Sequence, residues 1–276
     1  MSDDAGNLSS AAECLRAAKN VVVFTGAGIS AESGIPTFRD SDGLWERFSP
    51  ERFATWDGLV KTAVADPRLF TDFLIAVLEP IAVAAPNPAH LAVAELEKHV
   101  RVIVVTQNVD GLHQEAGSTT VHEVHGSIFE IVTLGGRFVR LLSRTEIQGI
   151  VRKLREAREA TLALPKALRA IHSMLGPSGV SIHRPKIVLF GEAMAEPAWS
   201  LAQEAAERCD CMITVGTSAM VMPAAMLPGI ARSAGASTID VGLAPGEADF
   251  PLTGPAARVL PGLVRAAFGE PGGCGI

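Results

Sequence analysis

The chain has 276 residues, of which 48% are hydrophobic, and a net charge of −6. This length can bury the core of one large domain, or of a large domain with an insert, and the net acidity without a dominant basic block argues against a nucleic-acid partner. The four cysteines are scattered, so we expect no disulfide framework and a cytoplasmic protein. The N-terminal start is polar, so we expect no secretory signal. No apolar run reaches about 18 residues, so we expect no membrane partner.

Five short apolar runs are predicted to be buried strands, and helical patterns lie between them. The runs cover residues 21–24, 102–106, 187–190, 212–215 and 237–241. One of the intervening helices is predicted over residues 89–98. Alternating strands and helices are typical of a parallel sheet covered on both faces, with ligands at the carboxyl ends of the strands. The predicted fold class is therefore α/β, with a Rossmann-like parallel sheet.

Two segments interrupt this alternation, and we predict that they form a smaller, mostly helical domain. They cover residues 36–88 and 127–184, which leaves residues 1–35, 89–126 and 185–276 for the Rossmann-like domain. The second insert is basic, with ten Lys or Arg residues against four Asp or Glu residues. Its basic residues either form a solvated helix face or dock an acidic partner.

Two amphipathic helices are predicted inside the second insert. The apolar face of the first consists of Ile147, Ile150, Val151, Leu154, Ala157 and Thr161. The second helix is predicted to start at Pro165, because proline suits the first turn of a helix. Its inward residues are predicted to be Leu168, Ile171 and Leu175. Apolar packing between the two helices would hold the insert together.

A glycine-rich loop follows the first predicted strand and is a candidate anion site. Its sequence is Gly26-Ala27-Gly28-Ile29-Ser30. Glycine allows a sharp turn and a close approach, and the N-terminus of a following helix offers unpaired N–H groups and a positive dipole end. The next residues, Gly34-Ile35-Pro36-Thr37-Phe38-Arg39, add a stiff turn, an aromatic ring and a guanidinium. Such a segment is expected where a loop folds over a bound dinucleotide.

His125 is the candidate general base, since histidine takes up a proton near neutral pH. His113 and His122 are nearby alternatives. Polar residues also follow the second strand, at Gln107, Asn108 and Asp110. Their side chains either bond turn amides or line a polar pocket.

Six motifs, in this order, resemble those of the sirtuins, the NAD-dependent protein deacylases. The six are Gly26 to Ser30 with Gly34 to Arg39, Gly43-Leu44-Trp45-Glu46, Thr106-Gln107-Asn108-Val109-Asp110-Gly111-Leu112-His113, His125-Gly126, Phe190-Gly191-Glu192 after Arg184-Pro185, and Gly216-Thr217-Ser218 with Pro223-Ala224. They extend over nearly the whole chain. The resemblance implies NAD as co-substrate and an acylated lysine in a protein or peptide as the second substrate.

The resemblance also implies roles for individual residues. His125 would act as general base on a ribose hydroxyl after the acyl oxygen has displaced nicotinamide. Asp110 would hold the nicotinamide carboxamide, and Asn108 would order a water and the ribose, so these two join His125 as catalytic residues. The implied cofactor-binding residues are Gly26, Ala27, Gly28, Ser30, Phe38, Arg39, Trp45, Gln107, Asn108, Asp110, Gly216, Thr217, Ser218, Asp240 and Ala256. Asp240 stands where the family normally has Asn, and its charge would favour NAD over NADP.

Two departures from the family pattern affect metal binding and substrate choice. Sirtuins typically bind a structural zinc through two Cys-x-x-Cys pairs, but residues 127–184 contain no cysteine and only two histidines, so we expect no metal site. Acid-selective relatives carry a Tyr-x-x-Arg where Leu74 and Val77 stand here, and this chain has no tyrosine. A carboxylate on the acyl chain would then be buried unpaired, so acetyl or longer apolar acyl groups are expected.

Two other classes of function stay open from the sequence. One is an NAD glycohydrolase or mono-ADP-ribosyltransferase, which needs the same pocket with a different acceptor. The other is an NAD-binding module with little catalysis, since the change in the zinc segment alters the neighbourhood of the peptide site.

Overall fold

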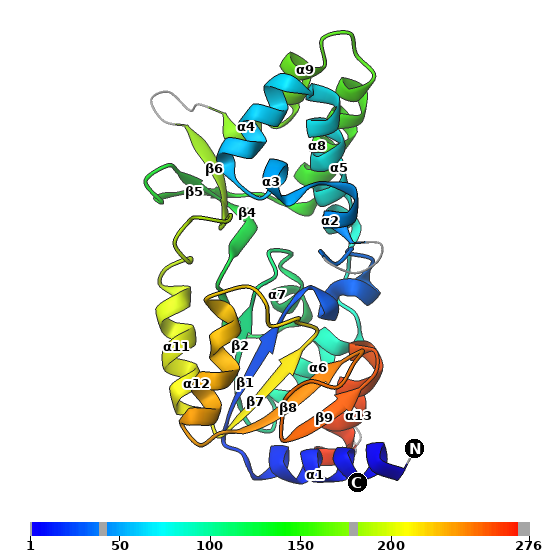
Figure 1. Ribbon diagram of the computed structural model, residues 1–276, viewed down its shortest axis with the longest axis vertical. Coiled ribbons are helices and arrows are strands. Elements are labelled where there is room, and N and C mark those ends of the chain that lie inside the picture. Colours follow the sequence, from blue (N-terminus) through cyan, green and yellow to red (C-terminus); the bar gives the residue numbers. More distant parts are fainter. Residues whose placement is uncertain (1, 39–42, 177–181, 270–276) are drawn as a thin grey trace, which may run out of the picture.

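The computed structural model describes residues 2–38, 43–176 and 182–269, and within them the strands form two sheets (Figure 1). The larger sheet is parallel, with six strands in the order β3-β2-β1-β7-β8-β9. In that order the strands span Val121–Glu123, Arg101–Thr106, Asn20–Thr25, Cys211–Val215, Ser237–Gly242 and Phe250–Thr253. Four of the five predicted strands are confirmed here.

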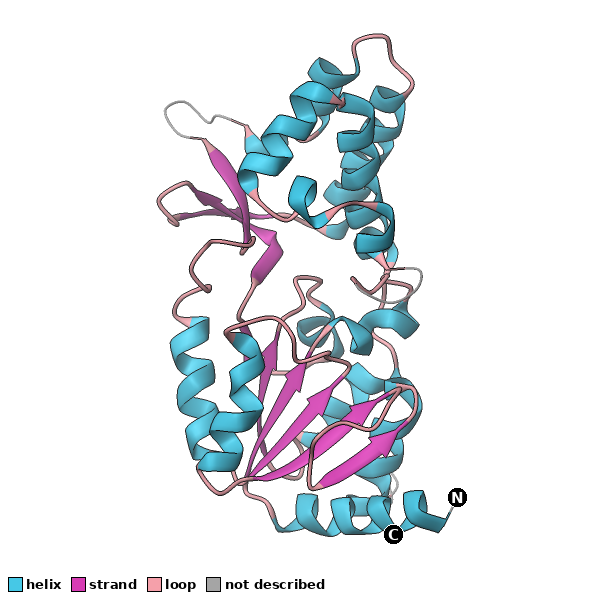
Figure 2. Ribbon diagram, in the orientation of Figure 1, coloured by secondary structure: helices cyan, strands magenta, loops and turns pink. Residues whose placement is uncertain are grey.

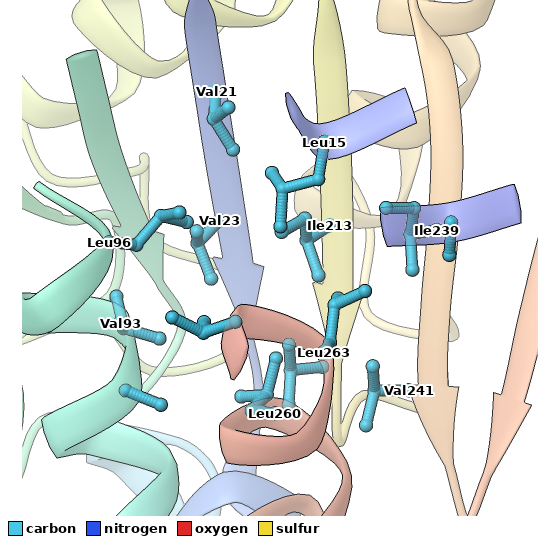
Figure 3. Close-up of a cluster of buried hydrophobic side chains, with 14 of the residues drawn as sticks. Leu15, Val21, Val23, Val93, Leu96, Ile213, Ile239, Val241, Leu260 and Leu263 are labelled. Carbon is cyan, nitrogen blue, oxygen red and sulfur yellow. The ribbon is translucent and has the colours of Figure 1, made fainter. Parts of the chain in front are cut away.

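Helices cover both faces of the parallel sheet, because consecutive strand residues point to opposite sides. One face carries α1 (Ser2–Ala17), α6 (Pro88–Leu96) and α13 (Ala256–Phe268), which pack on Val21 and Val23 of β1 (Figure 3). The other face carries α11 (Ala198–Arg208) and α12 (Leu227–Ser233), which pack on Val22 and Phe24. The predicted α/β fold with a Rossmann-like sheet is confirmed, and so is the helix predicted over residues 89–98.

The sheet has its topological switch point between β1 and β7. The chain leaves β1 toward α6 on one face and leaves β7 toward α12 on the opposite face. Loops that diverge in this way open a crevice at the carboxyl ends of the strands, where ligands bind in this class of fold. The glycine motifs at Gly26 and Gly216 both lie at this point.

The second sheet is antiparallel and was not predicted. Its order is β5-β4-β6, with β5 at Phe138–Leu141, β4 at Gly126–Thr133 and β6 at His183–Ile187. Figure 2 shows it apart from the parallel sheet. The predicted strand over residues 187–190 is therefore wrong: only Ile187 lies in a strand, the pairing is antiparallel, and Phe190 is 48% exposed. A four-residue apolar run does not by itself distinguish a buried strand from an apolar loop.

Helices accompany the antiparallel sheet in the upper half of Figure 1. They are α2 (Leu44–Arg47), α3 (Pro50–Phe53), α4 (Trp56–Ala65), α5 (Pro67–Val83), α8 (Arg144–Arg158), α9 (Ala163–Ala170) and α10 (His172–Leu175). No single described helix is long and apolar enough to cross a membrane, and only α5 and α6 together, bent by 57°, have the required length and composition.

The apolar face predicted for the first insert helix is confirmed over α8, but its last member is wrong. Ile147 and Leu154 are fully buried against Leu78 and Ile81 of α5. Thr161 is exposed, because α8 ends before it.

The second insert helix differs more from its prediction. α9 starts at Ala163, two residues before Pro165. Leu168 is 48% exposed, whereas Ala167 and Ala170 are buried. The inward prediction is therefore wrong for Leu168, but it is confirmed for Ile171, which is 2% exposed, and Leu175 packs partly buried against the same cluster.

Candidate active site

The loops after β1 and β7 meet through their backbones at the switch point. The N–H of Gly28 donates to the carbonyl oxygen of Gly216 at 2.8 Å, and the N–H of Gly26 donates to that of Val215 at 3.0 Å. Residues Ala27–Ser33 then form the 3-10 helix η1. Gly26 and Gly28 therefore cannot offer these two amides to an anion, and the anion site stays a prediction for the rest of the loop. Their amides are already paired within the protein, because β1 and β7 are neighbours.

Ser30, Asn108 and Asp110 form one buried hydrogen-bonded cluster beside this contact. The Ser30 hydroxyl donates to Asp110 Oδ2 at 2.7 Å, and the Leu112 N–H donates to Asp110 Oδ1 at 3.0 Å. Asn108 Nδ2 donates to the Gly26 carbonyl and to Ser30 Oγ, both at 3.1 Å. Burial raises the pKa of Asp110, while the Leu112 amide, the Ser30 hydroxyl and the charge of Arg144 act against that rise.

His125 lies at the carboxyl end of β3 and is oriented by Gln107. Its Nδ1 lies 3.1 Å from the Gln107 carbonyl oxygen. Because a carbonyl only accepts, Nδ1 carries the proton, and Nε2 is the nitrogen that can accept one. Burial lowers the pKa of His125, although its bond to the Gln107 carbonyl opposes that change. The side chain of Gln107 also accepts a hydrogen bond from the Thr217 hydroxyl at 2.9 Å, which joins His125 to the second glycine loop.

Two further histidines lie under the cluster. His90 Nδ1 accepts from the Asn87 N–H at 3.4 Å, so its Nε2 carries the proton that points to Ser30 Oγ, 3.5 Å away. His113 Nε2 lies 3.0 Å from the Thr25 hydroxyl, and the two imidazole rings are 5.0 Å apart. Burial lowers the pKa of His90 to about 4 and that of His113 to about 3, so both are neutral at pH 7.

Sequence reasoning missed His90. The sequence does contain an indication of its position. His90 stands three residues after Asn87, the N-cap of α6, and a side chain at that spacing can accept a hydrogen bond from the N-cap amide. His113, an alternative to His125 as the base in the sequence analysis, is 1% exposed. His122, in β3, has its pKa lowered by burial.

The remaining candidate residues lie around the rim of the cluster. The rings of Phe38 and Trp45 are 5.4 Å apart, and Arg39 lies outside the described residues. Ser218 is exposed in the loop after β7, and burial raises the pKa of the Asp240 carboxyl in β8. Ala256 begins α13, whose first turn meets η1: the Ala257 N–H donates to the Glu32 carboxylate at 3.3 Å. No hydrogen bond or ion pair joins Phe38, Trp45, Ser218, Asp240 or Ala256 to Asp110 in the described parts of the chain.

No group of three or more His, Cys, Asp or Glu residues in the described ranges could hold a metal ion. The site is thus made of a carboxylate, an amide, an imidazole and backbone groups. Such a set suits neutral hydrogen-bonding partners such as hydroxyls and a carboxamide.

The pattern of the Sir2 family matches residues 26–223, and the chain therefore belongs to that family. Curated relatives agree over nearly the full length. The chain is 38% identical to the NAD-dependent protein deacylase of Pyrococcus furiosus over 263 residues, covering 94% of this chain and 97% of the relative. It is also 38% identical to the NAD-dependent protein deacylase of Pseudomonas putida over 266 residues, covering 94% of each.

Solved structures are similar in fold as well. A Sir2 homologue in complex with NAD aligns with a TM-score of 0.72 at 34% identity, covering 93% of this chain and 92% of that one. A mutant Sir2 homologue with 2′-O-acetyl-ADP-ribose aligns with a TM-score of 0.74 at 34% identity, covering 93% and 94%. Sir2Af2 bound to a myristoylated histone peptide aligns with a TM-score of 0.67 at 33% identity, covering 97% of both chains.

Proposed function

We propose that this chain is an NAD-dependent protein-lysine deacylase, which converts NAD, an acylated lysine and water into nicotinamide, free lysine and O-acyl-ADP-ribose. The observation that carries the proposal is the grouping of His125, Asn108 and Asp110 at the carboxyl ends of β2 and β3, beside the contact of Gly28 and Gly216. Membership of the Sir2 family and the two deacylase relatives support it.

Asp110 and Asn108 are proposed to bind the nicotinamide half of NAD. The carboxylate of Asp110 can accept a hydrogen bond from the carboxamide, and the Ser30 hydroxyl and the Leu112 amide hold it in one orientation. Asn108 uses its side-chain nitrogen within the protein, so its side-chain oxygen is the group available to a water or a ribose hydroxyl. NAD supplies the ribose carbon at which the acyl oxygen of the lysine substrate takes the place of nicotinamide.

His125 is proposed to take the proton from a ribose hydroxyl through Nε2. The Gln107 carbonyl holds the Nδ1–H, which fixes both the tautomer and the plane of the ring. Because burial lowers the pKa of His125, the ring is neutral and able to act as a base at pH 7. The deprotonated hydroxyl can then attack the acyl carbon, and water completes the release of the lysine and leaves the acyl group on the ribose.

The phosphate and adenosine half of NAD is assigned to the two glycine loops and the ends of β8 and α13. Gly26, Ala27 and Gly28 in the first loop and Gly216, Thr217 and Ser218 in the second lie at the switch point, where the glycines allow a ligand to approach closely. Asp240 would bond ribose hydroxyls and repel the extra phosphate of NADP. Ala256 would contact the adenine. The nicotinamide side would be covered by Phe38 and Trp45, and also by Arg39, which lies outside the described residues.

The small domain is proposed to fold without zinc. Residues 127–184 supply no cysteine, and the apolar face of α8 packs directly along α5. Ion pairs of Arg155 with Glu79 and of Arg158 with Asp72 add to that packing. We assign residues 36–88 and 127–184 to this domain, and the rest of the chain to the NAD-binding domain.

The acyl substrate is proposed to be acetyl or a longer apolar chain. Leu74 and Val77 of α5 are partly buried among apolar side chains of the small domain, and no arginine stands at either position. A relative of similar fold binds a myristoylated peptide. A cytoplasmic location is also proposed, because the described cysteines, Cys14, Cys209 and Cys211, are free thiols.

One assay tests the activity and the acyl preference together. The protein is incubated with NAD and matched acetyl, hexanoyl and succinyl lysine peptides, kcat/KM is measured on each, and the products are identified by mass spectrometry. Acyl-ADP-ribose with a preference for acetyl or hexanoyl over succinyl is expected. Free ADP-ribose without deacylation would show a glycohydrolase. A mass gain on the protein would show a transferase, and NAD binding without turnover would show a binding module. Each of these results would contradict the proposal.

A further inference from the structure

Arg144 joins the basic insert to the segment that carries Asp110. It is the first residue of α8, and its Nη2 donates to the main-chain carbonyl oxygen of Asp110 at 2.8 Å. Its Nε pairs with Glu115 of α7 (Leu112–Ala116), and its Nη1 donates to the carbonyl oxygen of Ile81 in α5. The three nitrogens of one guanidinium thus bind three separate parts of the chain.

The guanidinium is enclosed as well as bonded. Only 18% of the Arg144 side chain is exposed, and its guanidinium carbon lies 5.0 Å from the centre of the Phe129 ring. Phe129 also faces the residue after Asp110, since a Cβ added at Gly111 would lie 3.2 Å from the ring. Arg144 and Phe129 therefore hold the segment of residues 109–111 from the same side.

The start of α8 does not itself require an arginine. Ser143 caps the helix: its hydroxyl accepts from the Glu146 N–H at 3.2 Å, and the Glu146 carboxylate accepts from the Ser143 N–H at 2.8 Å. A cation in the first turn is unfavourable next to the positive end of the helix dipole. The reason for Arg144 therefore lies in its contacts outside α8.

We propose that Arg144 is a positioning residue for the NAD pocket, which fixes the Asp110 main chain so that its carboxylate meets Ser30 and the nicotinamide carboxamide. The inference rests on the proposed role of Asp110. A lysine cannot replace this arginine, because a single ammonium cannot reach the Asp110 carbonyl, Glu115 and the Ile81 carbonyl with the geometry of a planar fork. Small misplacements of a binding group reduce catalysis strongly.

The test compares Arg144→Met and Arg144→Lys with a control on the same helix, Arg158→Met. Arg158 pairs with Asp72 and Glu159 and has no contact with the Asp110 segment. We expect Arg144→Met to raise the KM for NAD and the inhibition constant of nicotinamide by about tenfold or more. The KM for the acyl peptide should change less than twofold, Arg144→Lys should restore little, and Arg158→Met should match the wild type in all three constants.

NAD affinity is also measured by calorimetry without peptide, on variants whose circular dichroism matches the wild type. If the wild type fails to deacylate but Arg144→Met still binds NAD more weakly, the proposed function fails and the positioning role stands. If Arg144→Met binds NAD and nicotinamide like the wild type, or Arg158→Met weakens them equally, the positioning role is wrong. If Arg144→Met does not fold, the same comparison is made with Arg144→Lys, which retains the charge.

Discussion

The N–H of Gly28 donates to the carbonyl oxygen of Gly216 at 2.8 Å, so the loops that follow β1 and β7 touch main chain to main chain. A Cβ at position 28 would lie 2.7 Å from Gly216 Cα, and one at position 216 would lie 2.5 Å from the Gly28 carbonyl carbon. Neither loop can carry a side chain at this point. The contact therefore sets the spacing of the two loops that we assign to NAD.

Gly28→Ala is expected to lower the free energy of unfolding by roughly 1–3 kcal/mol, because backbone atoms must move to admit the methyl group. The same shift should weaken NAD binding by about tenfold or more. Urea denaturation and calorimetric titration measure the two effects. The matched control is Gly149→Ala in α8, where nothing lies within 4 Å of the added Cβ. It should add about 0.5–1 kcal/mol of stability. Wild-type NAD affinity in Gly28→Ala would contradict the prediction.

His125→Ala is expected to abolish deacylation and to leave NAD binding largely intact, because the base acts after NAD is bound. Single-turnover assays and calorimetry separate the two steps. His122→Ala is the control, and it should keep its activity. A deacylation rate in His125→Ala equal to that of the wild type would show that another group is the base.

The pH dependence of the wild type provides a second test of His125. Burial lowers the pKa of this imidazole, so the neutral form that accepts a proton persists below the usual histidine range. On the acidic side of the pH profile, the midpoint of the decrease in kcat/KM should therefore lie below pH 6.5, the unperturbed pKa of histidine. A limb well above that pH would be incompatible with this residue as the base.

The strands and the site motifs could be predicted to different degrees, for physical reasons. β1, β2 and β7 contain runs of apolar residues that are mostly buried, which the residue pattern shows directly, whereas β8 has only Ile239 and Val241 among polar residues. The pairing of β4 with β6 is interrupted by a register shift, and β6 is only half-buried and contains His183, Arg184 and Lys186, so its apolar pattern is weak. β9 is short and contains Pro251, which is unusual in a strand.

Site residues near the strand ends were predictable because each follows an apolar run within the same motif. The partners that orient them were not, since they come from distant elements. His90 lies 60 residues from Ser30, and Arg144 lies 34 residues from Asp110. The pairing of the Gly28 amide with Gly216 depends on which strands are neighbours, and no local pattern contains that information.

Treatment with a strong chelator is expected to leave the fold intact, because apolar contacts between α5 and α8 stabilise the small domain. Purified protein should contain far less than one zinc per chain by elemental analysis. Its thermal midpoint and circular dichroism should be the same with and without the chelator. About one tightly bound zinc per chain, together with unfolding on chelation, would overturn the proposal of a zinc-free domain.

The stability of the protein is expected to fall between pH 6.5 and pH 4.5, because His90 and His113 are buried as neutral rings. The pKa of His90 is lowered to about 4 and that of His113 to about 3, whereas unfolded histidine titrates near 6.5. In this range the two histidines bind more protons in the unfolded chain than in the folded one. Each histidine then removes up to about 1.4 kcal/mol of stability per pH unit as the pH decreases.

Glu123 acts in the opposite direction and supplies the sharpest test. Burial raises the pKa of its carboxyl to about 7, and its Oε1 has no hydrogen-bond partner among the described residues. The folded state therefore binds this proton between pH 7 and the unfolded value near 4.3, which stabilises the fold as the pH decreases. Glu123→Gln removes that opposing contribution, so its loss of stability from pH 6.5 to pH 4.5 should be steeper than in the wild type. Urea denaturation at both pH values measures the difference, with the exposed Glu156→Gln in α8 as control. Equal slopes in the wild type and Glu123→Gln would show that folding does not raise the pKa of Glu123.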